Sequence, residues 1–571
     1  MLCLFSFFQL SFGASPFIPD NNISGALQKE FERQLPKFNA LPEPVAPSPI
    51  EKTQEESQNQ VTVTVKGFRF EGAHLISDEE LQSELQSWVG KKVSFNELQK
   101  AADQIAEIYR KQHLLAQTNI PPQDFQQEDA IILIKILEAK LGAIRIDPEQ
   151  KGRFKQGLMK DYILFDSQLG EHFYTNRIER SLYLLNELPG VAIDSEIEPG
   201  DNDGEVALRL KFADKPLVSG YGTLSNYGGT STGVIQGLIN FNMNNLSGYG
   251  DQVTLTTISS LGSQYGQIGY SIPVGASGLK AGITISNLYY STIGDFAGSQ
   301  GSSTNWGGNL SYPLLRTQST NANLSLAYLN KSNYNYNLTT ASLVSNYVIN
   351  EYTFGISGNH YDSFWIGGVT NASINFVSGN FSMLPDSAGL TYGQFTAPTF
   401  SKLTFSVTRN QQIIPDKMIL NININGQFAS GNLDGVERFY LGGANGVRAY
   451  PTSQGSGDQG AMLNLDLQYQ FPGNVLGYVF YDIGVVDQFK DINTFNALAS
   501  NTNAGNRYSL SGFGLGAKYS LYGVNLNGLV ALQLGENPLF RFDSASKNFV
   551  PQNNDGTTNS VYFWLQANYP F

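Results

Sequence analysis

The last two thirds of the chain alternate apolar and polar residues in short runs. One run has apolar residues at every second position, with Asn, Asp and Gln between them: Leu463, Leu465, Leu467, Tyr469 and Phe471. Because successive side chains of a strand point to opposite faces, this pattern predicts a strand with one apolar and one polar face. Runs of about ten residues are long enough to cross a bilayer when the strand is tilted.

About sixteen such runs follow Pro216, which leaves roughly 22 residues for each strand and its connection. None of them contains the 18 or so consecutive apolar residues of a transmembrane helix. Residues 216–571 are therefore predicted to be mainly β and to form a 16-stranded antiparallel transmembrane β-barrel. The alternative is a soluble β-sandwich or solenoid with one wet face.

Charge is distributed unevenly along the chain. Residues 1–215 hold 56 charged side chains, whereas residues 216–571 hold 29. A cation on the lipid face of a barrel costs roughly 2–4 kcal/mol at the bilayer midplane, whereas a soluble sandwich would use Lys and Glu freely on its surface. The depletion therefore favours the barrel. The net charge of −13 argues against nucleic acid as a partner, and the single cysteine, Cys3, excludes an internal disulfide.

The final run ends at the chain terminus. Its apolar residues alternate onto one face: Val561, Phe563, Leu565, Ala567, Tyr569 and Phe571. A last strand that ends in Phe resembles the C-terminal signal of bacterial outer-membrane proteins. Phe571 is therefore the candidate signal residue.

The first sixty residues predict a leader, a helix and a linker. Residues 1–15 contain an apolar stretch followed by small residues, which is typical of a secretory signal peptide. Residues 20–36 predict a helix, and residues 37–60 are rich in Pro and Gln and predict an extended linker. The helix has one narrow apolar stripe with a spacing of four residues: Ile23, Leu27, Phe31 and Leu35. Such a stripe is also typical of a helix docked on a neighbouring domain.

Residues 61–139 and 140–215 predict two similar α+β units. Each reads as strand, helix, helix, strand and strand. Ser77 followed by three acidic residues is typical of a helix start in the first unit. The similar order predicts an internal repeat in front of the barrel.

The chain offers no catalytic or nucleotide-binding set. Residues 229–233 fit a nucleophile-elbow pattern, but they lie between predicted barrel strands and far from any histidine in the sequence. The four histidines lack metal-ligand spacing, and no glycine-rich loop precedes a helix. Gly512, Gly514 and Gly516 lie in a predicted strand and are expected to ease its curvature. The sequence therefore predicts no enzyme, no metal and no cofactor.

One pair of charges stands out in the barrel region. Arg448 lies in a long glycine-rich loop, and Asp482 lies in a later strand whose polar face also carries Phe480 and Gly484. A carboxylate on a barrel wall needs a partner, and a bidentate bond from Arg448 would supply one. Gly484 would leave room for an incoming loop. Two unrelated charges in a wet lumen are the alternative.

These residues resemble the outer-membrane transporters of two-partner secretion, the haemolysin/haemagglutinin secretion-activation family (ShlB/FhaC/HecB-like). The family carries a Val-Arg-Gly-Tyr motif in a loop that folds into the pore, and its Arg bonds an Asp on the barrel wall. Val447, Arg448 and Tyr450 match this motif, Ala449 replaces its Gly, and Asp482 matches the wall Asp. The resemblance covers nearly the whole mature chain.

The resemblance implies the architecture of the whole chain. By this resemblance, the helix at residues 20–36 is a plug, and residues 61–139 and 140–215 are periplasmic POTRA domains. Residues 433–458 are the pore loop of the barrel, which spans residues 216–571. It implies ATP-independent export of a large secreted β-rich partner, an adhesin or cytolysin, across the bacterial outer membrane. Outer-membrane lipid, the barrel-assembly machinery and periplasmic chaperones are further expected partners. A barrel-assembly factor of the same superfamily and a passive solute porin are the alternatives.

Overall fold

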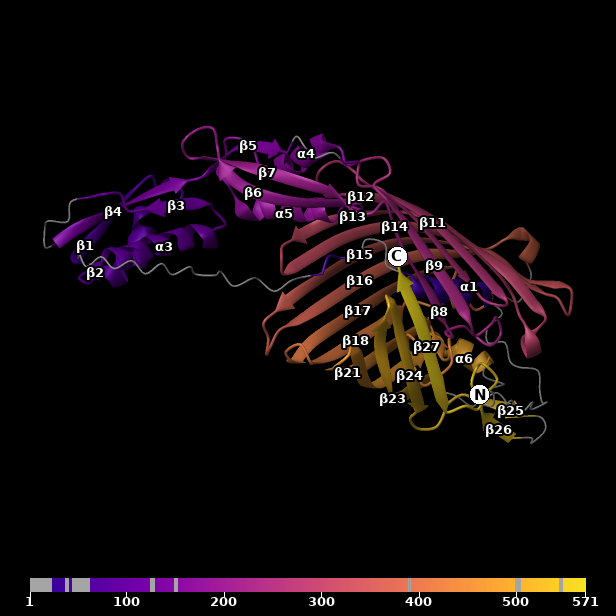
Figure 1. Ribbon diagram of the computed structural model, residues 1–571. Coiled ribbons are helices and arrows are strands. Elements are labelled where there is room, and N and C mark those ends of the chain that lie inside the picture. The colour runs from indigo at the N-terminus through magenta and orange to yellow at the C-terminus, as the bar shows by residue number, and fades with distance from the viewer. Residues whose placement is uncertain are drawn as a thin grey trace.

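The computed structural model describes residues 23–35, 41–43, 62–123, 129–147, 152–388, 390, 392–498, 505–543 and 548–571. A closed barrel forms the larger part of the protein, and two small α+β domains project from one end of it (Figure 1). The expected signal peptide lies outside the described residues, and so does the expected linker apart from residues 41–43.

The first α+β domain is a four-stranded sheet with the order β2-β1-β4-β3, packed on its helices. The Ser94 side chain accepts from the Glu97 main-chain N–H while the Glu97 carboxylate accepts from Ser94, and this capping box starts α3. The elements are β1 (Thr62–Glu71), α2 (Asp78–Leu85), η1 (Gln86–Trp88), β2 (Lys92–Ser94), α3 (Phe95–Lys111), β3 (Ala116–Asn119) and β4 (Asp129–Glu138).

The second α+β domain repeats this plan with a three-stranded sheet in the order β5-β7-β6. Both domains have a central parallel strand pair, and the register shifts early in the first strand of each pair, at Val65/Gly67 and at Leu141/Ala143. The elements are β5 (Lys140–Ile146), α4 (Gln156–Asp166), α5 (Thr175–Asn186), β6 (Val191–Pro199) and β7 (Glu205–Asp214).

The barrel has 16 antiparallel strands, which confirms the architecture predicted from the alternation. Its strands pair in chain order and close between the last and the first: β8 (Val218–Ser225), β9 (Gln236–Asn244), β10 (Gln252–Ser259), β11 (Ser263–Pro273), β12 (Lys280–Ser291), β13 (Ser299–Arg316), β14 (Thr320–Asn337), β15 (Ser342–Asp362), β16 (Gly368–Met383), β17 (Thr399–Ile414), β18 (Met418–Ala429), β21 (Gln459–Phe471), β22 (Val475–Asp487), β23 (Arg507–Leu521), β24 (Val524–Gln533) and β27 (Val561–Pro570).

The chain terminus completes the barrel seam. β27 pairs with β8 from Gln566↔Ser225 to Pro570↔Tyr221. Beyond that register, the Phe571 main-chain N–H donates to Gly220 O at 2.9 Å, and the Gly220 N–H donates to Phe571 O at 2.8 Å. Phe571 is therefore part of the closing ladder, and its side chain is half exposed.

The outer wall carries an aromatic row of the kind found at membrane interfaces. Trp306 on β13, Tyr328 on β14 and Tyr352 on β15 follow one another, with ring centroids 5.7 and 5.2 Å apart. Below this row, toward the α+β domains, the outward residues are apolar, such as Phe354 and Ile356 on β15. Interfacial aromatics beside an apolar band are typical of transmembrane barrels. No helix among the described residues is both long and apolar enough to span a membrane.

The second α+β domain is held against the turns at one end of the barrel. Arg316, whose side chain is 3% exposed, donates to Glu187 Oε1 at 2.5 Å from the end of β13. Lys280 Nζ lies 3.9 Å from Glu187 Oε2. Gly250 lies in the turn between β9 and β10. If it carried a Cβ atom, that atom would lie 3.0 Å from Leu188 Cβ, so the backbone of this barrel turn touches the domain directly.

Candidate functional site: the barrel interior

Helix α1 (Ile23–Gln34) lies inside the barrel, against β12, β13 and β14 (Figure 1). Leu27 and Phe31 are buried, and the Phe31 ring meets the Tyr265 ring edge-on at a centroid distance of 5.8 Å. Leu35 packs on the edge of the same cluster. The apolar stripe of the helix therefore faces the inner wall, while the side chain of Ile23 lies outside the described residues.

Polar contacts hold the rest of α1 to the wall and to the loop. Gln28 Nε2 donates to Ser286 Oγ at 2.9 Å, and Asn305 Nδ2 donates to Glu32 Oε1 at 2.9 Å. On its other side, Lys29 donates to the main-chain oxygen of Arg438 in the loop.

A long loop between β18 and β21 folds into the barrel beside α1. It contains η4 (Gly435–Glu437) and a small hairpin of β19 (Phe439–Tyr440) and β20 (Ser456–Gly457). Val447, Ala449 and Tyr450 at its tip are each at most 1% exposed. A Cβ at Gly25 of α1 would lie 2.7 Å from Val436 Cβ, so the helix and the loop are in direct contact.

The tip of the loop brings Arg448 to Asp482 on β22. Arg448 Nε donates to Asp482 Oδ2 at 2.9 Å, Arg448 Nη2 donates to Oδ1 at 2.7 Å, and the Arg448 main-chain N–H donates to Oδ2 at 3.0 Å. The guanidinium carbon lies 3.7 Å from the centroid of the Phe480 ring. Asp482 is fully buried. A bidentate ion pair of this kind fixes orientation as well as distance.

Three further residues complete the contacts of this tip. Arg448 Nη2 also donates to Asp466 Oδ1 on β21 at 2.6 Å. Asn464 Nδ2 donates to Asp482 Oδ1 at 2.8 Å, and Trp564 Nε1 donates to Arg448 O at 2.7 Å. Arg448 is thus shared between two carboxylates, and its backbone is tied to the last barrel strand.

Glycines on the wall supply the space into which the loop packs. A Cβ at Gly484 would lie 2.5 Å from Leu441 Cδ2 of the loop. A Cβ at Gly512 would lie 2.3 Å from Ala449 Cβ, and one at Gly514 would lie 2.5 Å from Phe480 Cζ. The sequence predicts that Gly512 and Gly514 ease strand curvature. In the structure both also face the lumen and leave room there, Gly512 for the Ala449 methyl group and Gly514 for the Phe480 ring. The methyl group of Ala449 fits because Gly512 has no side chain.

The stem of the loop is held by a buried network of four charges. Glu437 accepts from Lys331 on β14, with Lys331 Nζ 2.6 Å from Glu437 Oε1, and from Lys402 on β17. Lys331 Nζ also lies 2.8 Å from Glu351 Oε2 on β15. Two cations and two carboxylates thus face one another in the lumen.

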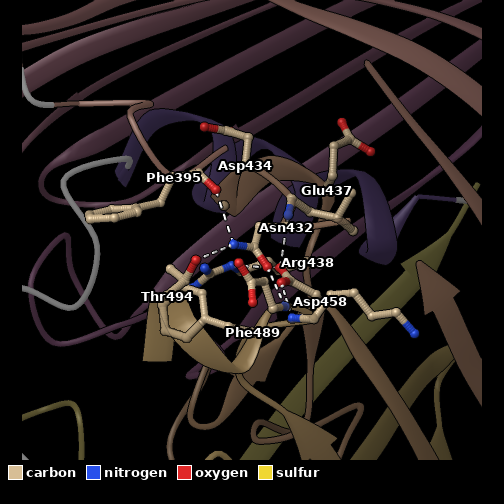
Figure 2. A network of polar contacts seen from close by, with 12 residues as sticks. Phe395, Asn432, Asp434, Glu437, Arg438, Asp458, Phe489 and Thr494 are labelled. Atoms are coloured by element: carbon tan, nitrogen blue, oxygen red, sulfur yellow. Dashed lines mark hydrogen bonds and ion pairs between the residues drawn. The ribbon is translucent and has the colours of Figure 1, made fainter. Parts of the chain in front are cut away.

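The base of the loop is tied to neighbouring loops (Figure 2). Asp458 accepts from the main-chain N–H groups of Leu433 and Lys490 at 2.9 and 2.8 Å, and Arg438 Nε lies 3.3 Å from it. Asn432 Nδ2 donates to Thr494 Oγ1 at 2.8 Å, in α6 (Ile492–Leu498). The loop is therefore anchored at its base, stem and tip.

Sequence reasoning identified Arg448 and Asp482 but missed Asp466, Trp564 and the Glu437 network. Asn464 and Asp466 lie on the polar face of the alternating run at residues 463–471, and this alternation could have indicated that both side chains face the lumen. Among the described residues, no three His, Cys, Asp or Glu side chains gather as a metal site would require.

A closed barrel with two α+β domains, an internal helix and an inward loop defines a class, the POTRA-plus-barrel proteins of the outer membrane. The profile described as "Haemolysin secretion/activation protein ShlB/FhaC/HecB" matches residues 204–519, and that of the ShlB-type POTRA domain matches residues 63–138. The chain belongs to the ShlB/FhaC/HecB family.

Individual relatives agree with this assignment. The heme/hemopexin transporter protein HuxB of Haemophilus influenzae (strain 86-028NP) is 26% identical over 546 residues, covering 92% of this chain and 93% of HuxB. The structure of CdiB from Escherichia coli has a TM-score of 0.64 at 20% identity and covers 92% of this chain and 94% of CdiB. BamA from Haemophilus ducreyi lacking POTRA domains 1–3 has a TM-score of 0.54 at 13% identity, covering 90% of this chain and 100% of that structure.

The protein is an outer-membrane transporter that exports a secreted partner protein by two-partner secretion. The domains at one end of the barrel lie in the periplasm, as POTRA domains do in this family. The family assignment and the location confirm the predictions from the sequence.

Proposed function

We propose that the partner crosses as an extended chain through the barrel lumen, without ATP, after α1 has left it. The observation that supports this proposal is that α1 lies inside a barrel whose seam is closed, packed against β12 to β14 and the loop. An extended chain needs the space that the helix occupies. Folding of the partner outside the cell would give the movement its direction.

The first contact of the partner would be strand addition in the periplasm. β6 pairs with β7 alone and is an edge of the second POTRA sheet, with Ile197 half exposed on it. An extended peptide can add to such an edge through main-chain hydrogen bonds. This contact would place the partner beside the periplasmic mouth of the barrel.

Arg448 and Asp482 would keep the loop in its place while the partner passes. The pair is buried, bidentate and reinforced by Asp466, so the loop tip has one strongly preferred position. Phe571 would serve as the signal that the barrel-assembly machinery reads, since it lies at the seam. Outer-membrane lipid would surround the apolar band, and periplasmic chaperones would keep the partner unfolded.

The partner itself would be a large β-rich secreted protein of the adhesin or cytolysin type. The name of HuxB makes a protein of haem or hemopexin acquisition a second kind of partner to test. We expect no enzymatic activity, since the sequence contains no catalytic set and no nucleotide-binding motif. An assembly factor is less well supported, because the family match is to secretion proteins.

Co-expression tests this function. The chain would be expressed with candidate secreted β-helical proteins, and the medium would be assayed for each. Appearance of one candidate in the medium, dependent on this chain, is the expected result. Equal release of all candidates, or release of none while small solutes pass, would support the porin alternative instead.

A further inference from the structure

The turn between β15 and β16 presents three large apolar side chains at the end of the barrel that carries the POTRA domains (Figure 1). Phe364 and Trp365 are 70% and 71% exposed, and Ile366 is 39% exposed. The main chain of Trp365 has a φ of 59°, which a bulky residue rarely adopts. These three side chains form the aromatic tip of the turn. A contiguous exposed apolar group of this kind marks a surface that another molecule covers.

A polar network fixes the backbone of this turn. Arg409 on β17 donates to both carboxylate oxygens of Asp362 at the end of β15, with Nη2 2.9 Å from Oδ1. Gln411 Nε2, on the same strand as Arg409, donates to the main-chain oxygens of Phe364 and Gly367 at 3.2 and 3.0 Å. The aromatic tip therefore stands on a backbone that side chains of the neighbouring strand hold at both ends.

The network lies on the outer face of the barrel. On β17, Lys402 points into the lumen, where it bonds Glu437, so the odd-numbered residues of this strand point outward. Arg409 and Gln411 are therefore outward. Because Gln411 bonds the main-chain oxygens of the turn from this outer face, the turn leans toward the lipid side of the wall.

The level of the turn matches the inner edge of the membrane. The aromatic row of Trp306, Tyr328 and Tyr352 marks the outer edge of the apolar band, since outward residues beyond it, such as Asn350, are polar. A strand rises about 3.3 Å per residue and is tilted by about 40°, so each residue descends roughly 2.5 Å. From Tyr352 to Asp362 on β15 the descent is about 25 Å, which is the height of the apolar band in membrane barrels. The turn that follows Asp362 therefore lies at the inner interface.

The wall between the aromatic row and the turn is continuous with the lipid-facing surface. Ile356 on β15 pairs with Ile374 on β16, and their side chains are 49% and 56% exposed. Arg409 follows toward the periplasm, and Asp362 balances its charge. An outward Arg costs least near an interface. Going toward the periplasm, the outer wall thus presents an apolar surface, then a neutral ion pair, then the aromatic tip.

We propose that the β15–β16 turn is a membrane anchor. Its aromatic tip inserts into the phospholipid interface of the periplasmic leaflet, and its polar network holds the tip toward the membrane. Aromatic rings favour this interface, and the Trp ring combines an apolar body with a polar N–H.

The anchor acts through its rings rather than through charge. The N–H groups of Arg409 all donate within the protein, to Asp362, Thr370 and Gln411. Arg409 therefore has no donor left for a lipid phosphate. Insertion of the tip is expected to be independent of the charge of the lipid headgroups and of salt.

The position of the anchor determines its effect on the barrel. The second POTRA domain contacts three successive periplasmic turns, at Gly250, at Gly278 and at Arg316. The β15–β16 turn is the next one along the rim. A domain bound to one side of the rim can tilt the barrel, and an anchor on the neighbouring turn opposes that tilt.

Spin labels measure whether the tip is in the membrane. Phe364→Cys and Trp365→Cys each leave the other ring in place, and Cys3, in the expected signal peptide, is the only native cysteine. Asp416→Cys, in the exposed periplasmic turn between β17 and β18, is the control. Each labelled variant is placed in bilayers of phosphatidylethanolamine and phosphatidylglycerol, and the accessibility of the label to oxygen and to a water-soluble nickel chelate is compared. Electrophoretic mobility confirms that each variant is folded.

The labels at positions 364 and 365 should favour oxygen over the chelate several-fold more than the label at position 416 does. This preference should be the same in phosphatidylcholine bilayers and at high salt. Labels at 364 and 365 that meet the chelate as readily as the label at 416 would overturn the proposal. Shielding that appears only when a candidate partner is added, or only as the ratio of protein to lipid rises, would also refute it, because the tip would then dock on a protein.

A matched pair of variants tests the polar network. Gln411→Leu removes both hydrogen bonds to the turn, so the label at position 365 should move faster and lose part of its preference for oxygen. Gln412→Leu makes the same change on the lumen side of the same strand and should alter neither quantity. Equal effects of the two variants, or no effect of Gln411→Leu, would show that the network does not hold the tip toward the membrane.

Discussion

The guanidinium of Arg448, at the tip of the loop, contacts two carboxylates and the ring of Phe480. Asp482 accepts three hydrogen bonds from Arg448, and Asp466 accepts a fourth. The two carboxylates are therefore compensated by one cation in a buried part of the lumen. Removing the cation leaves both without a counter-charge, although Asp482 keeps its hydrogen bond from Asn464. Removing Asp482 leaves Arg448 paired with Asp466.

The first prediction concerns this asymmetry. Arg448→Ala should reduce secretion of the partner more than Asp482→Ala does, because breaking a fully buried pair costs on the order of 3–5 kcal/mol. The double variant should be little worse than Arg448→Ala, since the two residues share one interaction. Secretion is measured in the medium, with barrel assembly checked by electrophoretic mobility. Impaired export by both single variants, with a loss in the double variant equal to the sum of the two single losses, would contradict the shared interaction.

The second prediction concerns Ala449 and Gly512. Gly512→Ala should destabilise the folded barrel, because the new methyl group would lie 2.3 Å from Ala449 Cβ. Ala449→Gly in the same chain should restore part of the lost stability by making room. The restoration is partial, since Leu532 O would also lie 2.8 Å from the new Cβ. The thermal unfolding midpoint in detergent measures both effects, and a double variant no more stable than Gly512→Ala would refute the packing role.

At the scale of elements, the barrel follows from the sequence more fully than the contacts inside it. Alternation placed Asp482 on the polar face of β22 because a strand has a period of two. It gave no hint that Glu437 meets Lys331 and Lys402, which lie 106 and 35 residues away in the chain. Such pairs depend on which strands face each other across the lumen. The apolar stripe of α1 was visible, but the stripe alone fits a docked helix equally well.

The third prediction tests α1 as the plug. Deletion of residues 20–36 should raise the single-channel conductance in planar bilayers, because the helix fills the lumen. Phe31→Ala should raise the fraction of time spent in the high-conductance state, since removing a buried Phe costs about 3–5 kcal/mol. Arg33→Ala, on the exposed side of the helix, is the matched control. A deletion variant that conducts like the parent would remove α1 from the conduction path.

The fourth prediction concerns the last strand. Deleting Phe571 removes two main-chain hydrogen bonds to Gly220 as well as the ring, and should lower the outer-membrane level of the protein. Phe571→Ala keeps those bonds and removes the ring alone. If the ring is the signal, both variants should fail alike; if only the ladder matters, Phe571→Ala should insert normally. Fractionation of the outer membrane measures the levels, and normal insertion of both would refute the signal role.

At the scale of the whole molecule, the parts differ in how firmly they are fixed. The loop is held by ion pairs at its stem and tip, and the second POTRA domain is held through Glu187 and Arg316. Helix α1 is held by two buried apolar side chains and by hydrogen bonds such as those to Ser286 and Asn305, rather than by ion pairs like those of the loop. The helix is thus the part that can leave while the barrel, loop and POTRA domain keep their places. Export therefore requires the release of α1 alone.

A reversible tether of α1 tests whether the helix must leave the lumen. A Cβ at position 25 of α1 would lie 2.7 Å from Val436 Cβ of the fixed loop, so a shift of about 1 Å reaches the Cβ separation of a disulfide. Cys3, in the expected signal peptide, is the only native cysteine. In Gly25→Cys/Val436→Cys, oxidation should stop secretion of the partner and reduction should restore it, while the response of each single variant should not depend on oxidation. Undiminished secretion from a fully oxidised double variant would contradict the account, because the partner would then cross with α1 still in the lumen.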